Sequence, residues 1–270
     1  MNRTKIEYAD YTWNPITGCL TGCPYCFARE IANRFGGWTL PSGKTVHTML
    51  EGETGVLDEP LDVMRSNEEW QKAPFPYDFV PTLHRYRLDE PQTVKKPSTI
   101  FVGSMADMFA EWVPDEWIKT VLDACGKASH HTYLFLSKNS NRYYELSNGE
   151  LDIIPDSISD YTPDWWFGAS ASTEADAQAA YENPNCSWMS LEPLHGEFSD
   201  DFFCGKESFD SRWDWIVVGA ESGHRKGKVI PERRWITAIV EYCEDTGTPL
   251  FMKNSLQSVW AAPLIQELPW

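Results

Sequence analysis

Three cysteines, Cys19, Cys23 and Cys26, lie close together near the amino terminus in the run CLTGCPYC. Three thiolates at this spacing can bind three irons of an iron-sulfur cube and leave its fourth iron without a protein ligand. An iron with an open position can bind a small molecule and take part in a reaction. The spacing therefore predicts a 4Fe-4S cluster with three protein ligands, and with it an enzyme.

Two other uses of these thiols are compatible with the sequence. A structural zinc site also uses clustered cysteines, but it needs four ligands, and no histidine or fourth cysteine lies near the run. Plain buried thiols are the second alternative. Disulfides are disfavoured because the total of seven cysteines is odd and because the polar start MNRTKIEYAD lacks the features of a secretory leader.

The composition is that of a globular protein. Its 270 residues, of which 42% are hydrophobic and 14% aromatic, can fill the core of one large α/β barrel or of two small domains. No stretch approaches the roughly 18 consecutive apolar residues of a membrane helix, so we expect a cytoplasmic protein without a membrane partner. A formal charge of -17 would repel a phosphate backbone, which disfavours nonspecific coating of nucleic acid.

One segment of the chain concentrates positive charge, in contrast to the negative charge of the whole protein. The segment HRKGK at 224–228 is followed by Arg233 and Arg234. Such a loop could bind a phosphate or a carboxylate, and a solvated loop is the simpler interpretation.

Short apolar runs alternate with helical patterns along most of the chain, which is typical of a parallel α/β sheet. The spacing of Phe27, Ile31 and Phe35 predicts a helix over 27–35, directly after the last cysteine. Further helices are expected over 115–128, 174–181 and 232–245. Continuous apolar runs predict strands that are buried on both faces, at 99–103, 132–136, 165–170, 187–191, 215–219 and 249–252. One further strand is expected earlier in the chain.

Residues from about 36 to 98 follow a different pattern, with frequent glycine and proline and few clean periods. We interpret this region as an irregular insertion, with a short hairpin around 51–54 and a helix near 60–72. The remaining elements predict a single domain over 1–270, a partial or complete parallel (β/α) barrel of the TIM barrel type.

In such barrels the loops that follow the strands line one open face, so polar residues just beyond each apolar run are candidates for binding. Asp107 could accept a hydrogen bond from an ammonium group and Lys138 could pair with a carboxylate; alternatively, Asp107 caps its loop and Lys138 lies in solvent. No catalytic acid or base is assigned. The candidate binding residues are Ser104, Ala106, Asp107, Lys138, Ser170, Ser172 and Glu192.

Several further residues stand near these positions. Glu221 and Lys253 follow later strands, and they could instead pair with each other. Upstream of the cysteines, Trp13 is expected in the core, and Tyr11 and Asn14 could lie beside the cluster or approach a substrate. A second cluster is disfavoured because the remaining cysteines show no close pair; they are Cys125, Cys186, Cys204 and Cys243.

The spacing C-x3-C-x2-C, with an aromatic residue before the last cysteine, resembles the signature of the radical S-adenosylmethionine enzymes. In that family the open iron binds the amino and carboxylate groups of S-adenosylmethionine, and an electron from the cluster breaks a carbon-sulfur bond to give the 5′-deoxyadenosyl radical. The resemblance implies both cofactors for this chain, with Cys19, Cys23 and Cys26 as the metal ligands.

The segment after the second strand resembles the spore photoproduct lyase branch of that family. In this branch a short Ser-Asp pair holds the methionine amino group, a lysine after the next strand reaches the methionine carboxylate, and a serine after the following strand meets the ribose. The resemblance implies these roles for Ala106-Asp107, Lys138 and Ser170. Ala106 departs from the pattern because it lacks the hydroxyl.

Most of the chain outside 36–98 also resembles a family of phage and prophage proteins known for this three-cysteine motif. The segments that carry the resemblance are TWNPITGC, CPYCFARE, PSTIFVGSMADMF, SLEPL, IVVGAESG and PLFMKN. The resemblances imply a radical S-adenosylmethionine enzyme that modifies or repairs a nucleobase or nucleotide, with an electron donor such as flavodoxin or ferredoxin. The alternative is a non-enzymatic interaction module that holds structural zinc or a cluster and could bind nucleic acid through 225–234.

Overall fold

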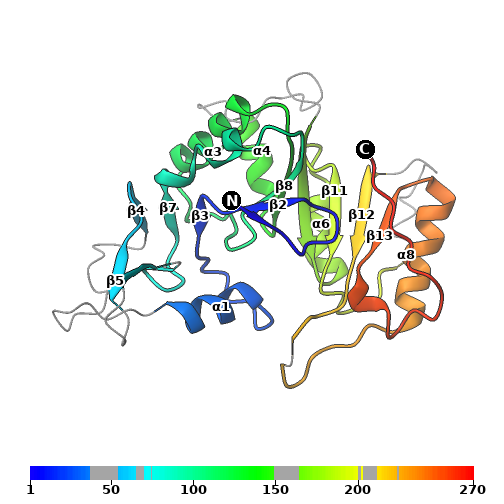
Figure 1. Cartoon of the computed structure of the whole chain (residues 1–270). Coiled ribbons are helices and arrows are strands. Elements are labelled where there is room, and N and C mark those ends of the chain that lie inside the picture. The colour runs from blue at the N-terminus through cyan, green and yellow to red at the C-terminus, as the bar shows by residue number, and fades with distance from the viewer. Residues whose placement is uncertain are drawn as a thin grey trace. The chain divides into compact units, whose positions relative to one another are not determined.

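The structure is a computed structural model that describes residues 1–36, 54–64, 70–73, 75–148, 164–199, 202, 212–223 and 225–270. The chain divides into two compact units, Met1–Tyr133 and Leu134–Trp270, and each is described by itself (Figure 1). This division does not test the expectation of a single domain, which stays a prediction.

The first unit contains a sheet with the strand order β1-β2-β8. β1 (Asn2–Arg3) pairs antiparallel with β2 (Tyr11–Trp13), and β2 pairs in parallel with β8 (Thr99–Val102). Trp13 is fully buried, which confirms its expected place in the core. α3 (Asp115–Lys127) follows β8 and buries one apolar face, so the predicted helix at 115–128 is also confirmed.

Residues 36–98 hold more regular structure than the sequence predicts. β3 (Ile16–Thr17), β7 (Thr82–His84) and β4 (Gly55–Leu57) form a three-stranded sheet in the order β3-β7-β4. Two short helices follow β7, namely η2 (Arg85–Arg87) and α2 (Glu90–Thr93).

The helix predicted near 60–72 is wrong. β5 (Asp62–Met64) and β6 (Trp70–Lys72) pair there as antiparallel strands. Helix propensity is a small term per residue, and pairing with a second strand overrides it. Of the hairpin predicted around 51–54, residues 51–53 lie outside the described residues.

The second unit is built on a sheet with the order β9-β10-β11-β12-β13. Its neighbours from β10 to β13 all pair in parallel, as the long apolar runs predict. The boundary between the two units falls within β9. The strands are β9 (Thr132–Ser137), β10 (Trp165–Ala171), β11 (Trp188–Leu191), β12 (Trp215–Val218) and β13 (Leu250–Met252).

Helices connect these strands at the predicted positions. α6 (Glu174–Tyr181) begins at a capping box made by Thr173 and Asp176, and α8 (Arg233–Thr246) ends at Gly247 in a left-handed conformation. α4 (Asn141–Ser147) and η3 (Asn254–Leu256) complete the unit, and α1 (Phe27–Phe35) belongs to the first unit.

The chain is therefore a mixed α/β protein with sheets rich in parallel strands. Among the described residues of either unit, strand pairing does not close into a ring, so barrel closure is not observed. No helix in the described part of the chain combines the length and the apolar character needed to cross a membrane.

Candidate functional site

The loop with the three cysteines lies in the first unit, between β3 and α1. Gly18 opens this loop with a φ of +88°, and a β-carbon at this position would lie 2.3 Å from the carbonyl oxygen of Val80. Only glycine allows both this backbone conformation and this close approach. The amide of Cys19 then donates to the carbonyl of Phe79, so the first cysteine is anchored by its own backbone.

Arg29 ties the two ends of the cysteine loop together. Its amide donates to the Sγ of Cys26, which caps α1, at 3.4 Å, and its guanidinium donates to the carbonyl of Cys19 at 2.7 Å. The guanidinium also lies 4.8 Å from the ring centre of Phe79. Arg29 was not predicted from the sequence. The available signal was its position three residues after Cys26, where a backbone amide at the start of a helix needs an acceptor.

The structure brings the predicted segment 104–107 to this loop. Gly18 donates its amide to the carbonyl of Met105 at 2.9 Å and forms an isolated parallel bridge with Ala106. The Met105 side chain packs with Cys19 and Cys26 against a buried cluster of α1 and the 75–79 segment. Two loops that are about 80 residues apart in the sequence thus form one local structure.

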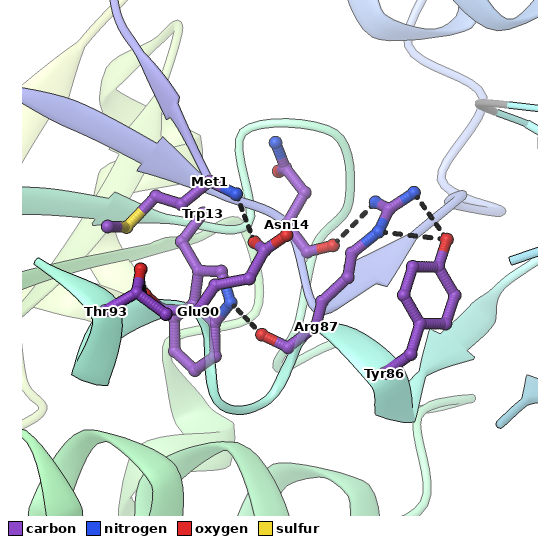
Figure 2. A network of polar contacts seen from close by, with 7 residues as sticks. All are labelled: Met1, Trp13, Asn14, Tyr86, Arg87, Glu90 and Thr93. Atoms are coloured by element: carbon purple, nitrogen blue, oxygen red, sulfur yellow. Dashed lines mark hydrogen bonds and ion pairs between the residues drawn. The ribbon is translucent and has the colours of Figure 1, made fainter. Parts of the chain in front are cut away.

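Asn14 connects this structure to β2. Its Oδ1 accepts hydrogen bonds from the Ser104 hydroxyl at 3.2 Å and from the Met105 amide at 3.0 Å. Its carbonyl accepts from Arg87, as Figure 2 shows, and the guanidinium of Arg87 also donates to the Tyr86 hydroxyl. Asn14 therefore supports the 104–107 segment, and its place beside a cluster or a substrate stays a prediction.

Trp13 and the amino terminus belong to the same network. The indole nitrogen of Trp13 donates to the carbonyl of Arg87 at 2.9 Å, and the terminal ammonium of Met1 forms an ion pair with Glu90 (Figure 2). Glu90 also accepts, through its carbonyl, from the hydroxyl of Thr93. The network fixes the 85–93 segment against β2, and Arg87 is a second positioning residue that the sequence analysis missed.

A buried histidine supports the strand that leads into the cysteine loop. The ring of His84 bonds to the Thr17 hydroxyl at 2.8 Å and to the Tyr86 hydroxyl at 3.2 Å. Burial, together with the nearby charge of Arg87, lowers the pKa of His84 to about 3. The imidazole is therefore neutral at pH 7.

Cys19 and Asp107 influence each other electrostatically. Burial raises the pKa of the Cys19 thiol, and the negative charges of Asp107 and Cys26 raise it further. A metal must therefore displace a proton from this thiol when it binds. Asp107 is 8% exposed, and its Oδ1 accepts from the amide of Phe109 at 3.3 Å, as expected for a carboxylate that caps its own turn.

The three cysteines offer thiol ligands for an iron-sulfur cluster. The three cysteines are half-buried and form no disulfide. No group of three or more His, Cys, Asp or Glu side chains in the described residues is placed to hold one metal ion, which a zinc site would require. In a cubane each thiolate binds a different iron, so the sulfurs need not converge on one point.

In the second unit, polar side chains gather on one face of the sheet. Lys138 donates to the hydroxyl of Ser170 at 3.4 Å, so these two predicted residues meet. Glu192 forms an ion pair with Lys253 at 2.7 Å, and its carboxylate would lie 3.0 Å from a β-carbon at position 219, where the chain has Gly219. The predicted binding residues Lys138 and Ser170 thus contact each other, and Glu192 contacts Lys253.

Ser172 has a structural place at the start of α6. Its amide donates to the carboxylate of Asp176 at 3.2 Å, and its carbonyl accepts from the amide of His195 at 2.9 Å. Ser172 is 3% exposed. A role in binding a cofactor stays a prediction for this residue.

Glu221 and Lys253 have different partners, contrary to the alternative that they pair with each other. The buried carboxylate of Glu221 accepts two hydrogen bonds from Arg225 at 2.7 Å and lies 3.3 Å from the ring of His195. The hydrogen bonds from Arg225 hold the pKa of Glu221 below its ordinary value. His195 was not identified from the sequence, where a lone histidine carries little signal.

The basic segment is partly neutralised. Arg225 is bound to Glu221, and Arg234 forms ion pairs with Glu197 and Glu232. Arg233 lies over the ring of Trp260. Phosphate binding by this segment stays a prediction.

The other described cysteines are core residues. Cys125, Cys186 and Cys243 are buried, and burial raises the pKa of each thiol, to about 12 for the last two. Such thiols are inert. Cys204 lies outside the described residues.

Comparisons with known proteins identify a family and a similar fold. The model of a family described as "Protein of unknown function (DUF5131)" matches residues 3–260. A solved structure of a cysteine-to-serine mutant of spore photoproduct lyase is similar with a TM-score of 0.50 and 10% sequence identity, over 93% of this chain and 78% of that chain. A tyrosine-to-phenylalanine mutant of the same enzyme gives a TM-score of 0.48 and 9% identity over the same shares. No curated protein sequence matches this chain.

Proposed function

The chain belongs to the DUF5131 family, and we propose that it is a radical S-adenosylmethionine enzyme that uses a 4Fe-4S cluster. The fold resemblance to spore photoproduct lyase supports an enzyme of this type. The proposal depends above all on one observation: the cysteine loop and the 104–107 segment are bonded to each other through Gly18 and Met105.

Each residue has a defined task in this proposal. Cys19, Cys23 and Cys26 hold the cluster as thiolates, and Asp107 accepts a hydrogen bond from the methionine ammonium of the cofactor. Lys138 pairs with the methionine carboxylate, Ser170 bonds to the ribose, and Glu192 orients the nucleoside. Ser104 and Ala106 shape the loop through Asn14 and Gly18.

When bound, the cluster and S-adenosylmethionine supply the 5′-deoxyadenosyl radical, and the protein supplies position and the exclusion of water. We propose a nucleobase or nucleotide as substrate, in keeping with the resemblance to the lyase branch. Reduced flavodoxin or ferredoxin is the proposed electron donor.

Anaerobic reconstitution with ferrous iron and sulfide tests the proposal. The protein should acquire an absorbing iron-sulfur cluster and, with dithionite, convert S-adenosylmethionine to 5′-deoxyadenosine. Cys26→Ala should lose both properties, whereas Cys243→Ala, which changes a buried thiol of α8, should keep them. Formation of 5′-deoxyadenosine by Cys26→Ala would contradict the assignment.

The same experiment tests the alternative of an interaction module. A module would purify with colourless zinc in a fixed ratio and would not cleave S-adenosylmethionine after reconstitution. The enzyme is preferred because three cysteines at this spacing leave one iron of a cluster without a protein ligand, whereas structural zinc needs four ligands.

Asp107→Ala tests the contact with the cofactor. This variant should bind S-adenosylmethionine about tenfold more weakly, because it lacks a charge-assisted hydrogen bond, while its iron content stays unchanged. An unchanged dissociation constant for S-adenosylmethionine would show that Asp107 does not contact the cofactor.

A further inference from the structure

Ser190, in the middle of β11, carries a hydroxyl group without a partner. The residue is 1% exposed, and its Oγ makes no hydrogen bond with any described residue. A buried hydroxyl that lacks a hydrogen bond destabilises the folded protein, and native proteins keep few such groups. We therefore expect this hydroxyl to form a hydrogen bond with a group other than the described residues.

The position of Ser190 distinguishes its hydroxyl from the other buried side-chain atoms of the described residues that form no hydrogen bond. Those are nitrogens of Trp112, His131, Arg142 and Trp235, and none of them lies on a strand. Ser190 lies on β11 in register with Ser170 of β10. Residues in register on neighbouring parallel strands share a face, and their strands are about 4.8 Å apart. The two hydroxyls are thus neighbours.

On the face of the sheet that carries Ser190, the side chains change from aromatic to polar at this residue. Side chains alternate along a strand, so Trp188 lies on this face on one side of Ser190, and its ring centre is 5.1 Å from that of Trp215. Beyond Ser190, the face carries the ion pair of Glu192 with Lys253. Ser170, which accepts a hydrogen bond from Lys138, lies beside the boundary between the aromatic and the polar part.

We propose that Ser190 binds the ribose of S-adenosylmethionine together with Ser170. The inference rests on the proposed function and adds a binding residue to it. A serine hydroxyl can donate one hydrogen bond and accept two, and each ribose hydroxyl has the same capacity. Two adjacent serines therefore complement a vicinal diol, and the diol satisfies the hydroxyl of Ser190, which the described residues leave without a partner.

The test measures binding by calorimetry, without turnover, to reconstituted protein. Ser190→Ala should bind S-adenosylhomocysteine about three- to tenfold more weakly than the unsubstituted protein, with equal iron content. Its melting temperature without ligand should be equal or higher, since the substitution removes an unsatisfied polar group. Ser190→Cys, which replaces the hydroxyl with a larger thiol that forms only weak hydrogen bonds, should weaken binding in the same way.

Two nucleosides identify the part of the ligand that Ser190 contacts. Adenosine should bind more weakly to Ser190→Ala than to the unsubstituted protein, whereas 2′,3′-dideoxyadenosine should bind equally to both. An equal loss for both nucleosides would overturn the assignment to ribose.

The control is Ser147→Ala, which removes a buried hydroxyl of α4 that accepts from Asn185 at 2.6 Å. It should lower the melting temperature and leave binding unchanged. If Ser190→Ala behaves like this control, its hydroxyl is structural and the inference is wrong, although the proposed function stands. If the unsubstituted protein does not bind S-adenosylhomocysteine, the proposed function fails, and the inference fails with it.

Discussion

The cysteine loop of the first unit and the polar sheet face of the second unit hold their functional candidates by different means. The cysteine loop depends on long-range side-chain contacts, such as those of Asn14 with Ser104 and Met105 and of Arg29 with Cys19. The sheet face depends on strand register, which places Ser170 beside Ser190. A loop site therefore needs many separate supports, whereas a regular sheet positions several side chains through a few strand pairings.

The largest effect is expected for Gly18→Ala. The new methyl group would lie 2.3 Å from the carbonyl oxygen of Val80 in a backbone conformation with a φ of +88°, so the loop must move. We expect a loss of about 3 kcal/mol or more in the free energy of unfolding, and iron content after reconstitution well below half of normal. Thermal unfolding and iron analysis measure both.

Gly126→Ala is the matched control for Gly18→Ala. Gly126 lies in α3, and nothing lies within 4 Å of the position of a new β-carbon. We expect it to raise stability by up to about 1 kcal/mol, because alanine is the better helix former. Full iron loading by Gly18→Ala would show that the close approach to Val80 is dispensable.

Gly168→Ala applies the same change to the sheet. Its β-carbon would lie 2.2 Å from the Trp188 ring, which must then shift relative to Trp215. We expect a cost of about 1–3 kcal/mol from overpacking, a change in tryptophan fluorescence, and normal iron content. Loss of iron in this variant would show that the two regions do not act independently.

Asn14→Ala tests the support of the 104–107 segment. The variant loses the acceptor for the Ser104 hydroxyl and the Met105 amide, so we expect a loss of about 1–2 kcal/mol and faster hydrogen exchange at Met105. Asn14→Asp keeps the acceptor oxygen and should lose less. Equal exchange rates in all three proteins would contradict the proposed support.

The two regions should also lose stability in different pH ranges. His84 has a folded pKa of about 3 against an ordinary value of 6.5, so its contribution is complete above pH 6.5 and is lost as the pH falls toward 3. The loss is at most about 1.4 kcal/mol between pH 6.5 and 5.5. Glu221 has a lowered pKa, so its contribution is lost only below its ordinary value of 4.5.

Urea unfolding at pH 7.0, 5.5 and 4.0 measures these contributions. His84→Gln should show a smaller loss between pH 7.0 and 5.5, with the part that comes from His131, whose pKa burial also lowers, remaining. Glu221→Gln should show the loss in full. If His84→Gln keeps the same dependence on pH in that range, the histidine is not the group responsible.

The regular elements were the most predictable part of the fold. All six strands predicted from apolar runs after residue 98 are present, and α6 has the predicted bounds, Glu174–Tyr181. A continuous apolar run or a clear helical period allows few ways to bury its side chains. The secondary structure of such a segment can therefore be predicted without knowing which other segment packs against it. The strands β5 and β6 were not predicted, because their identity depends on pairing with each other rather than on their own pattern.

In the candidate site, the residues with functional side chains were easier to predict than the residues that hold them in place. The cysteines and Ser104, Asp107, Lys138 and Ser170 stand at loops or strand ends, where polar groups are recognisable from the apolar run before them. Four supporting residues were not predicted, because each contacts a residue that is distant along the chain and no local pattern indicates the contact. They are Arg29, Arg87, His84 and His195.

The amino-acid sequence alone determined the donor chemistry of this protein and the alternation of strands and helices, because thiol spacing and apolar periodicity are local properties of the chain. Only the tertiary structure decided that Gly18 and Met105 join the cysteine loop to a second loop, and that Ser190 is buried beside Ser170 with no hydrogen bond to a described residue. Both facts depend on the close approach of segments that are distant in sequence, and such distances follow from packing as a whole rather than from any one segment.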